Sequence, residues 1–162
     1  MQSSKRIINL GCGSSNYGTD RVDFIQTKST TLVWNLEKGI PYPNEVFDEV
    51  YSHLFLEHLA NVGSHLKECY RVLKQGGVID VTTDNAACQR YYWFGTHTGR
   101  YESLHPKGDR HFSIFTKNHL KNHFEIAGLK NIQIEFVKTD TLGKWLDLFT
   151  RQKPRIKVVA KK

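Results

Sequence analysis

The sequence lacks any apolar run long enough to cross a bilayer, and it holds only 3 cysteines, 4 prolines and 1 methionine among its 162 residues. A membrane-spanning helix needs about 20 consecutive apolar residues, so a span is excluded. The first six residues lead directly into the apolar run 7–10 and leave no room for a signal peptide. We therefore expect a cytoplasmic protein. Cys12, Cys69 and Cys88 form no close pair, which predicts reduced thiols rather than a disulfide framework.

A metal-binding motif is also missing. His119 and His123 stand four residues apart on a predicted helix, a spacing that two zinc ligands can use. Leu120 replaces the glutamate of the metalloprotease motif, however, and no cysteine lies nearby. We expect solvent-facing histidines there and no metal ion.

The composition predicts one globular domain over residues 1–162, because 39% of the residues are hydrophobic and 12% are aromatic. Lysine and arginine total 23 against 16 acidic residues, which gives a net charge of +7. Such a charge suits an anionic partner, whether nucleic acid, a phosphorylated substrate or an acidic surface. Part of the excess lies in 151–162, where a solvated surface explains it equally well.

Short apolar strands alternate with helical stretches, which is typical of an α/β domain with a largely parallel sheet. Apolar residues at three- and four-residue steps predict a helix over about 59–73, which Gly76-Gly77 ends. A second helix is predicted from Thr116, its cap, to Gly128. The predicted strands are 6–10, 20–24, 31–34, 47–51, 78–82, 132–136 and 156–160.

A long aperiodic stretch, 86–115, separates the fifth strand from the second helix. It is rich in Tyr, Trp, His, Gly and Arg. Loops of this length are uncommon in compact domains and are often functional. We interpret the stretch as an insertion that covers the substrate.

The clearest candidate for a binding site is the turn Gly11-Cys12-Gly13, which follows the apolar run 7–10. Glycines allow positive φ and a close approach of the backbone to a ligand. Ligands of open α/β sheets bind at the carboxyl ends of strands. Asp23 ends the next predicted strand, where its carboxylate can accept hydrogen bonds from both hydroxyls of a ribose.

In order and spacing, seven segments of the chain resemble class I S-adenosylmethionine-dependent methyltransferases of type 11, closest to the small group associated with polysaccharide biosynthesis. The resemblance is strong over 6–85 and looser over 111–137. It implies a Rossmann-like seven-stranded, mostly parallel sheet with helices on both faces and a last antiparallel strand, and S-adenosylmethionine as the cofactor. The segments are 9–13, 22–23, 35–37, 40–43, 47–51, 56–59 and 70–77.

The resemblance also implies roles in cofactor binding. Gly11 and Gly13 line the methionine part, and Asp23 binds the ribose hydroxyls. Asn35 lies near the exocyclic amine of the adenine, and Leu36 lies against its ring. The segment that begins with Ser52 and His53 forms the floor beneath the sulfonium. The complete expected set is Asn9, Gly11, Cys12, Gly13, Asp23, Asn35, Leu36, Ser52 and His53.

Two departures from the family pattern bear on that site. Eight residues separate Gly13 from Val22, so the helix that usually follows the glycine turn is one turn at most. Loop amides or a basic side chain would then hold the cofactor carboxylate in place of a helix N-terminus. Asn35 stands where many relatives place an aspartate, and its amide oxygen can still accept from an amine.

The candidate catalytic residues follow two strands. His53, Glu57 and His58 come after the fourth strand, and Asp84 comes after the fifth. Methyl transfer relies mainly on positioning and desolvation, and a general base is needed where the nucleophile arrives protonated. Glu57 and His58 equally fit a role in capping and orienting the following helix.

The insertion supplies the candidate substrate contacts, which are Tyr92, His105, Arg110 and His111. We expect methyl transfer to an oxygen or nitrogen of a small-molecule or glycan-like acceptor. Methylation of base amines is disfavoured, because 52–55 lacks the Asp/Asn-Pro-Pro-aromatic motif of the enzymes that perform it. A nucleic-acid methyltransferase acting elsewhere on RNA or DNA, and a noncatalytic module that binds the cofactor, remain alternatives.

Overall fold

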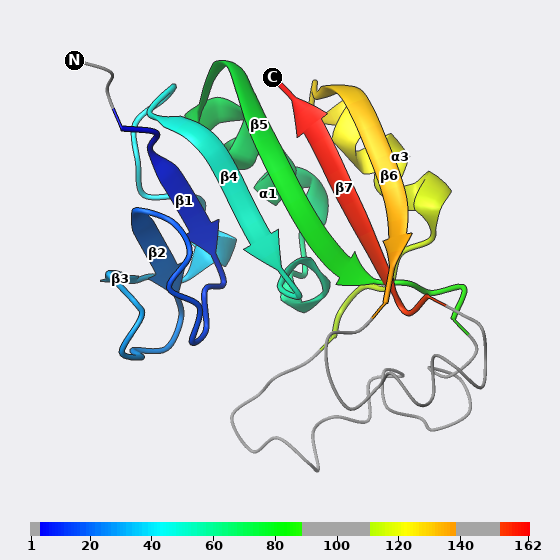
Figure 1. Ribbon diagram of the computed structural model, residues 1–162, viewed down its shortest axis with the longest axis horizontal. Coiled ribbons are helices and arrows are strands. Elements are labelled where there is room, and N and C mark those ends of the chain that lie inside the picture. The colour runs from blue at the N-terminus through cyan, green and yellow to red at the C-terminus, as the bar shows by residue number, and fades with distance from the viewer. Residues whose placement is uncertain (1–3, 89–110, 139–152) are drawn as a thin grey trace.

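A computed structural model describes residues 4–88, 111–138 and 153–162, in which seven strands form one sheet (Figure 1). The strand order is β3-β2-β1-β4-β5-β7-β6. Each of the seven predicted strands is confirmed, with bounds that differ by a few residues. The strands are β1 (Ile7–Leu10), β2 (Asp20–Asp23), β3 (Leu32–Val33), β4 (Phe47–His53), β5 (Leu73–Asp84), β6 (Lys130–Val137) and β7 (Arg155–Lys161).

Strand direction follows the expected mostly parallel pattern. β1 pairs in parallel with β2 and β4, β2 with β3, and β4 with β5. The last strand, β7, runs antiparallel to both β5 and β6. The predicted α/β sheet with a last antiparallel strand is therefore confirmed.

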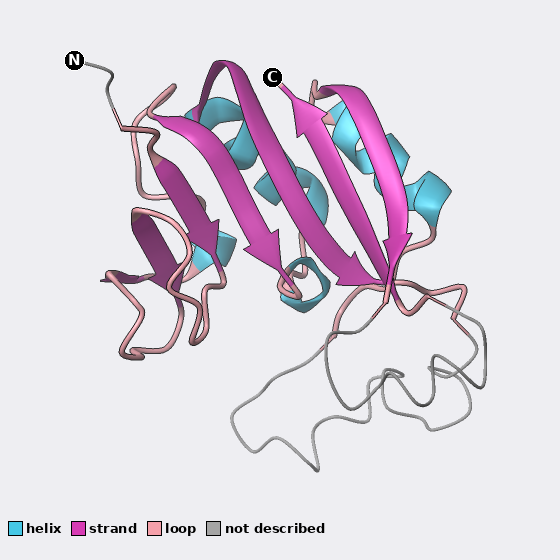
Figure 2. Cartoon of the chain, in the orientation of Figure 1, coloured by secondary structure: helices cyan, strands magenta, loops and turns pink. Residues whose placement is uncertain are grey.

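Within residues 4–88, 111–138 and 153–162, the helices beside the sheet are α1 (Val62–Val72), α3 (Lys117–Ile126) and the 3-10 helices η1 (Leu36–Lys38) and η2 (Leu56–His58) (Figure 2). Thr116 caps α3 as predicted, because its side chain accepts the backbone N–H of His119. Asn61 caps α1 by accepting from the N–H of Ser64, so this helix begins three residues later than predicted. No helix among the described residues is long and apolar enough to cross a membrane.

The prediction that Gly76-Gly77 ends the first helix is wrong. The helix ends at Val72, and β5 begins at Leu73, which is fully buried and pairs with Phe47 of β4. Gly76 lies inside β5, where its φ of +75° suits the absence of a side chain.

Both described α helices lie on the same face of the sheet and contact each other (Figure 1). On this face Val50, Ile79 and Ala160 are neighbours in register, and all are buried in the hydrophobic core. Leu66 of α1 and Phe124 of α3 belong to the same core. Burial of these apolar side chains stabilises the domain by about 25 cal/mol for each Å² removed from water.

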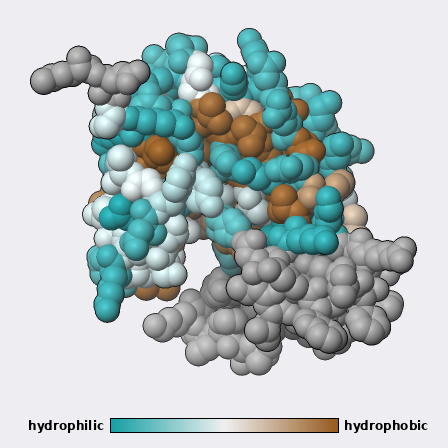
Figure 3. Space-filling model, in the orientation of Figure 1, coloured by the Kyte–Doolittle hydropathy of each residue, from teal (hydrophilic) through white to brown (hydrophobic). Residues whose placement is uncertain are grey.

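The opposite face carries loops and half-buried polar side chains, and here the expected helices on both faces are not found within the described residues. Tyr17, from the loop after β1, packs on Tyr51 of β4 with ring centroids 4.6 Å apart. The links 11–19 and 24–31 contain no helix, because they are shorter than the dozen or more residues that a helical crossover needs. Figure 3 shows hydrophilic residues interspersed with apolar ones on this face.

Candidate active site

The strand order brings the carboxyl ends of β1, β4 and β5 side by side at one edge of the sheet (Figure 1). Because β7 is reversed, its first residue also lies at this edge, and Arg155 pairs with Asp84 in register. The glycine turn after β1, the segment after β4 and the end of β5 therefore form one continuous candidate site.

The glycine turn is open to a ligand on one side. Gly11 has φ +67°, and a Cβ at this position would run into the ring of Phe55, so the side expected to face the cofactor is filled by an aromatic side chain. Gly13 has φ +52°, and a Cβ there would meet nothing within 4 Å. Position 11 therefore requires glycine, because a Cβ there would collide with the Phe55 ring. Gly13 instead borders open space.

Asp23 lies where the ribose was expected. One of its carboxylate oxygens accepts the backbone N–H of Gly13 at 2.8 Å, and the other accepts that of Ile25 at 3.0 Å. A carboxylate offers about four lone-pair positions. Asp23 therefore fixes the turn and keeps acceptor capacity for ribose hydroxyls.

Side chains hold the loop after β1, which contains no helix, as predicted. The Thr27 hydroxyl donates to the Gly13 carbonyl at 2.7 Å, and the buried Asn9 amide donates to the Tyr17 carbonyl at 3.1 Å. Asn9 is 1% exposed and Cys12 is 4% exposed. Both side chains are buried, and the expected contact of Asn9 and Cys12 with the cofactor stays a prediction.

Asn35 and Leu36 also serve the fold locally. The Asn35 side-chain oxygen accepts the N–H of Glu37 at 3.0 Å and caps η1. The Leu36 side chain is 5% exposed and belongs to the hydrophobic core. This side chain packs in the core, and the expected contact between Leu36 and an adenine ring stays a prediction.

Three exposed apolar side chains beside Asp23 were missed by the sequence reasoning. Phe24 is 70% exposed, Ile25 48% and Trp34 37%. The Trp34 backbone N–H donates to the Asp23 carbonyl at 2.8 Å, which holds the ends of β2 and β3 together. The sequence carried a signal for this apolar surface: Phe24 and Ile25 follow Asp23, and Trp34 precedes Asn35. They offer the apolar surface on which a planar base can stack.

Ser52 and His53 point to opposite faces of β4. Ser52 is 2% exposed, and its hydroxyl has no hydrogen-bond partner among the described residues. Ser52 therefore lies within the buried layer rather than at an open floor. His53 is half-buried, and its Nε2 lies 3.3 Å from Nη1 of Arg155.

Glu57 is the most deeply buried acid of the site, with 1% of its surface exposed. The Thr83 hydroxyl donates to its carboxylate at 2.7 Å. Burial, with the nearby charge of Asp84 adding to it, raises the pKa of Glu57 to about 7. The Glu57 carbonyl accepts the N–H groups of Phe112 and Ser113, which anchors the end of the insertion to η2.

Two histidines and a second acid adjoin Glu57. The rings of His58 and His111 are perpendicular, with centroids 4.5 Å apart. Oδ2 of Asp84 lies 3.5 Å from Nδ1 of His111, and both side chains are largely buried. The structure therefore brings Glu57, His58 and Asp84 together with His111, which was expected to contact substrate. Tyr92, His105 and Arg110 lie outside the described residues.

Thr83 and Arg155 complete the cluster and were not identified from the sequence. Arg155 was grouped with the basic residues near the end of the chain, and only the reversed β7 brings it beside Asp84 and His53. Thr83 gave no local signal apart from its position one residue before Asp84.

The histidines of α3 take no part in this site. His119 Nδ1 lies 3.2 Å from the Thr116 hydroxyl, at the start of the helix. The His123 ring lies edge-on to Phe115 at 6.1 Å. None of the three cysteines, all of which lie within the described residues, forms a disulfide.

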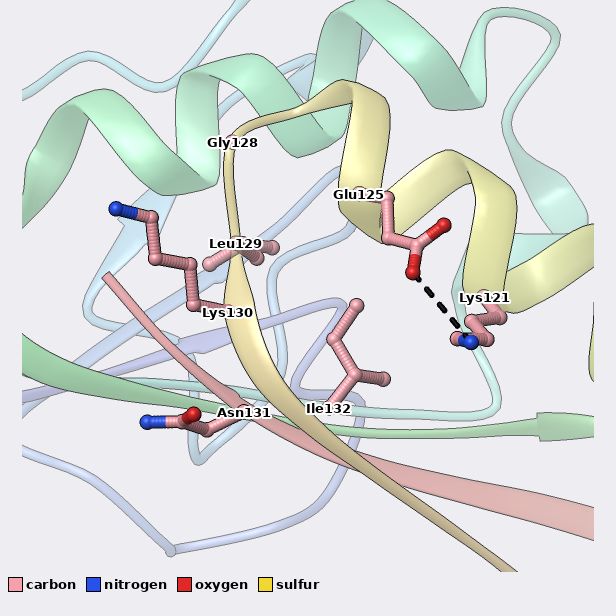
Figure 4. Close-up of a pocket in the computed structure, with 7 residues that line it drawn as sticks. All are labelled: Lys121, Glu125, Gly128, Leu129, Lys130, Asn131 and Ile132. Carbon is pink, nitrogen blue, oxygen red and sulfur yellow. Dashed lines mark ion pairs between the residues drawn. The ribbon is translucent and has the colours of Figure 1, made fainter.

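A surface pocket between α3 and β6 is separate from the site (Figure 4). Lys121 and Glu125, both of α3, form an exposed ion pair along the helix at 3.5 Å. The pocket lies at the start of β6, which runs parallel to β5, and so at the opposite edge of the sheet from Asp84. Its lining residues are Lys121, Glu125, Gly128, Leu129, Lys130, Asn131 and Ile132.

Comparison with known proteins agrees with this architecture. Residues 10–81 match a family model described as a methyltransferase domain, the type 11 family. No curated protein matches the sequence.

Among solved structures, a possible histamine N-methyltransferase from Thermotoga maritima has a TM-score of 0.72 at 14% identity, over 100% of this chain and 84% of that one. An S-adenosylmethionine-dependent methyltransferase from Mesorhizobium loti has a TM-score of 0.68 at 20% identity, over 97% and 90%. Phosphoethanolamine N-methyltransferase 2 from Haemonchus contortus, solved with S-adenosylmethionine, has a TM-score of 0.70 at 13% identity, over 100% and 49%.

The fold is that of the S-adenosylmethionine-dependent methyltransferases to which the chain is structurally similar, and residues 10–81 match the methyltransferase family model. Within that class it resembles the type 11 methyltransferases.

Proposed function

We propose that this protein is an S-adenosylmethionine-dependent methyltransferase that transfers a methyl group to an oxygen or nitrogen atom of a small-molecule or glycan-like acceptor in the cytoplasm. The observation that carries the proposal is the convergence of Glu57, His58, Asp84 and His111 at the carboxyl ends of β4 and β5, one strand away from the glycine turn. This arrangement puts polar, proton-accepting groups beside the expected cofactor site.

The residues around the glycine turn suit the nucleoside of S-adenosylmethionine. Asp23 keeps acceptor capacity for the ribose hydroxyls, since its carboxylate oxygens accept two backbone N–H groups and offer further lone pairs. Phe24 and Trp34 provide exposed apolar surface for the base. With no helix after the turn, the cofactor carboxylate depends on loop amides near Gly13.

The cofactor supplies a methyl carbon bound to a cationic sulfur, and an acceptor lone pair displaces that sulfur in line. The protein has to orient the acceptor and receive the proton that a hydroxyl or ammonium group loses. The carboxylates of Glu57 and Asp84 are the bases available in the cluster. His58 and His111 provide further hydrogen-bonding positions for a polar acceptor.

Arg155 brings a basic side chain to the cluster. Its guanidinium stands at the edge of the cluster beside His53, 3.3 Å from the ring nitrogen. Two structurally similar enzymes, the possible histamine and the phosphoethanolamine N-methyltransferases, bear names that denote small amine-bearing acceptors. We therefore place small molecules before nucleic acids among the candidate acceptors.

Replacement of Asp23 tests the cofactor site. In the Asp23→Ala variant we expect S-adenosylmethionine to bind about 1 to 3 kcal/mol more weakly by calorimetric titration, because the ribose hydroxyls lose their acceptor. Asp48→Ala is the matched control, since Asp48 pairs with Lys74 at the start of β4, far from the carboxyl ends. Equal affinities in the two variants would overturn the placement of the ribose.

The acceptor is identified by incubating the full chain with methyl-labelled cofactor and fractionated extracts. Label in the small-molecule or glycan fraction supports the proposal. Label found solely in RNA or DNA overturns the acceptor class. Cofactor binding without transfer to any fraction contradicts the proposed acceptors as a whole.

A further inference from the structure

Within the described part of the chain, Glu57, His58 and His111 form a group with the composition of a metal site. The ligand atoms that they offer all lie within 4.8 Å of one another. Two imidazole nitrogens and one carboxylate oxygen are a donor set that zinc and related divalent ions use in proteins, with other positions left to water or substrate. We infer that these three side chains bind a divalent transition-metal ion whose open positions face the acceptor.

The distances allow such an ion after small side-chain movements. An ion at about 2.0–2.2 Å from each donor separates the donor atoms by about 3 to 3.5 Å. The observed upper limit of 4.8 Å exceeds this separation by about 1.3 to 1.8 Å. The rings of His58 and His111 already adjoin each other edge to face, with centroids 4.5 Å apart, so we expect rotations of the two rings to bring their nitrogens to one ion.

The surroundings supply the outer contacts that metal-binding side chains need. Asp84 lies 3.5 Å from Nδ1 of His111, which directs Nε2 of this ring toward the ion. The Thr83 hydroxyl donates to one carboxylate oxygen of Glu57 at 2.7 Å and leaves the other oxygen for the ion. Such contacts hold ligands in one tautomer and one orientation.

The local charge also favours a cation. Glu57 and Asp84 are 1% and 5% exposed, and their negative charges act on each other. The guanidinium of Arg155 offsets part of this charge at the edge of the cluster. A divalent ion bound to Glu57 offsets the negative charge of this buried carboxylate and acts on Asp84 through His111.

The role of the ion rests on the proposed function, whereas its binding does not. An ion held by these ligands coordinates an acceptor hydroxyl oxygen and lowers its pKa, as metal ions do for bound water. Glu57 then serves as a ligand, and Asp84 remains as the nearby base for the released proton.

Calorimetric titration of zinc chloride into the chelator-treated, dialysed full chain tests the site. We expect one zinc ion per chain, and at least tenfold weaker binding in His58→Ala and in His111→Ala. His119→Ala is the matched control, because this histidine belongs to the start of α3 and should leave zinc affinity unchanged. Circular dichroism verifies folding, and His58→Asn and His111→Asn replace any alanine variant that fails to fold.

Absence of zinc binding by the wild-type chain, or equal affinity in wild type and both cluster variants, overturns the inference. Titration of the same preparations with S-adenosylmethionine separates the two proposals. A chain that binds the cofactor and transfers methyl groups but binds no zinc retains the proposed function and loses the metal site. A chain that binds zinc through His58 and His111 but transfers no methyl group retains the metal site alone.

Discussion

At the residue scale, Gly11 and Gly13 perform different tasks although they are two residues apart. Gly11 has φ +67°, and the Phe55 ring occupies the place where a Cβ would lie. Gly13 has φ +52° and borders open space. Left-handed backbone costs a residue with a Cβ about 1–2 kcal/mol. A steric clash in a packed site adds about 1–3 kcal/mol. The same substitution should therefore have unequal effects at the two positions.

We predict that Gly11→Ala lowers the free energy of unfolding by about 2 to 5 kcal/mol, because strain and the clash with Phe55 add. Gly13→Ala, the matched control, should cost about 1 to 2 kcal/mol from strain alone. Urea denaturation of both variants measures the difference. Equal losses would mean that the Phe55 ring moves aside without cost.

His65 of α1 is a buried histidine, 5% exposed, with its ring edge-on to Phe55 at 5.6 Å. Burial lowers its pKa to about 4. In the unfolded chain a histidine pKa is about 6.5, so the unfolded state binds the proton more tightly. The associated stability is present above about pH 6.5 and is lost as the pH falls toward 4.

Replacement by Phe, which cannot take up a proton, should flatten this dependence. We predict that wild type loses up to about 3 kcal/mol more than His65→Phe between pH 6.5 and 4, as measured by denaturant titrations at both pH values. The difference between the two proteins at each pH removes the contribution of the other titrating groups. Parallel curves for the two proteins would refute a neutral, buried His65.

At the element scale, α1 is tied to the segment that leads into β4. Arg71 donates from Nη1 to the Tyr42 carbonyl and from Nη2 to the Ile40 carbonyl, each at 2.8 Å. Glu68 of the same helix accepts the Ile40 N–H at 3.0 Å and pairs with Arg71. The helix thus orients the chain that enters the central strand of the site.

Because lysine lacks the planar fork that reaches both carbonyls, we predict that Arg71→Lys lowers the free energy of unfolding by about 1 to 3 kcal/mol. The exposed neighbour Lys67 provides the comparison, and Lys67→Ala should change stability by less than about 0.5 kcal/mol. Thermal and urea unfolding of the two variants measure this. If Lys67→Ala lowers the free energy of unfolding as much as Arg71→Lys does, the role given to the Arg71 guanidinium is contradicted.

Element types followed well from local sequence, and element ends followed less well. Alternating apolar residues identified the strands, and Thr116 identified the start of α3. The helix predicted from residue 59 begins at Val62, since Asn61 captures the Ser64 N–H. Its end was misjudged because Leu73 gains more from pairing with Phe47 in the core than from one further helical turn.

At the scale of the whole molecule, the net charge of +7 gives a way to distinguish classes of acceptor. A protein that contacts 6–10 phosphates loses about 10³–10⁵-fold in affinity between 50 and 200 mM salt. For the proposed small acceptor we predict that KM changes by less than about tenfold over this range, because few charges take part. A steep salt dependence would favour a nucleic-acid acceptor.

The sequence by itself determined the strands, the glycine turn with Asp23, and the nearness of Glu57 and His58 to a strand end, because each follows from local periodicity and spacing. Tertiary structure alone decided that Phe55 covers Gly11, that Leu36 turns into the core, that both described α helices share one face, and that Arg155 returns to Asp84. Side-chain direction and long-range pairing depend on how distant segments exclude water together, and no local pattern encodes that competition.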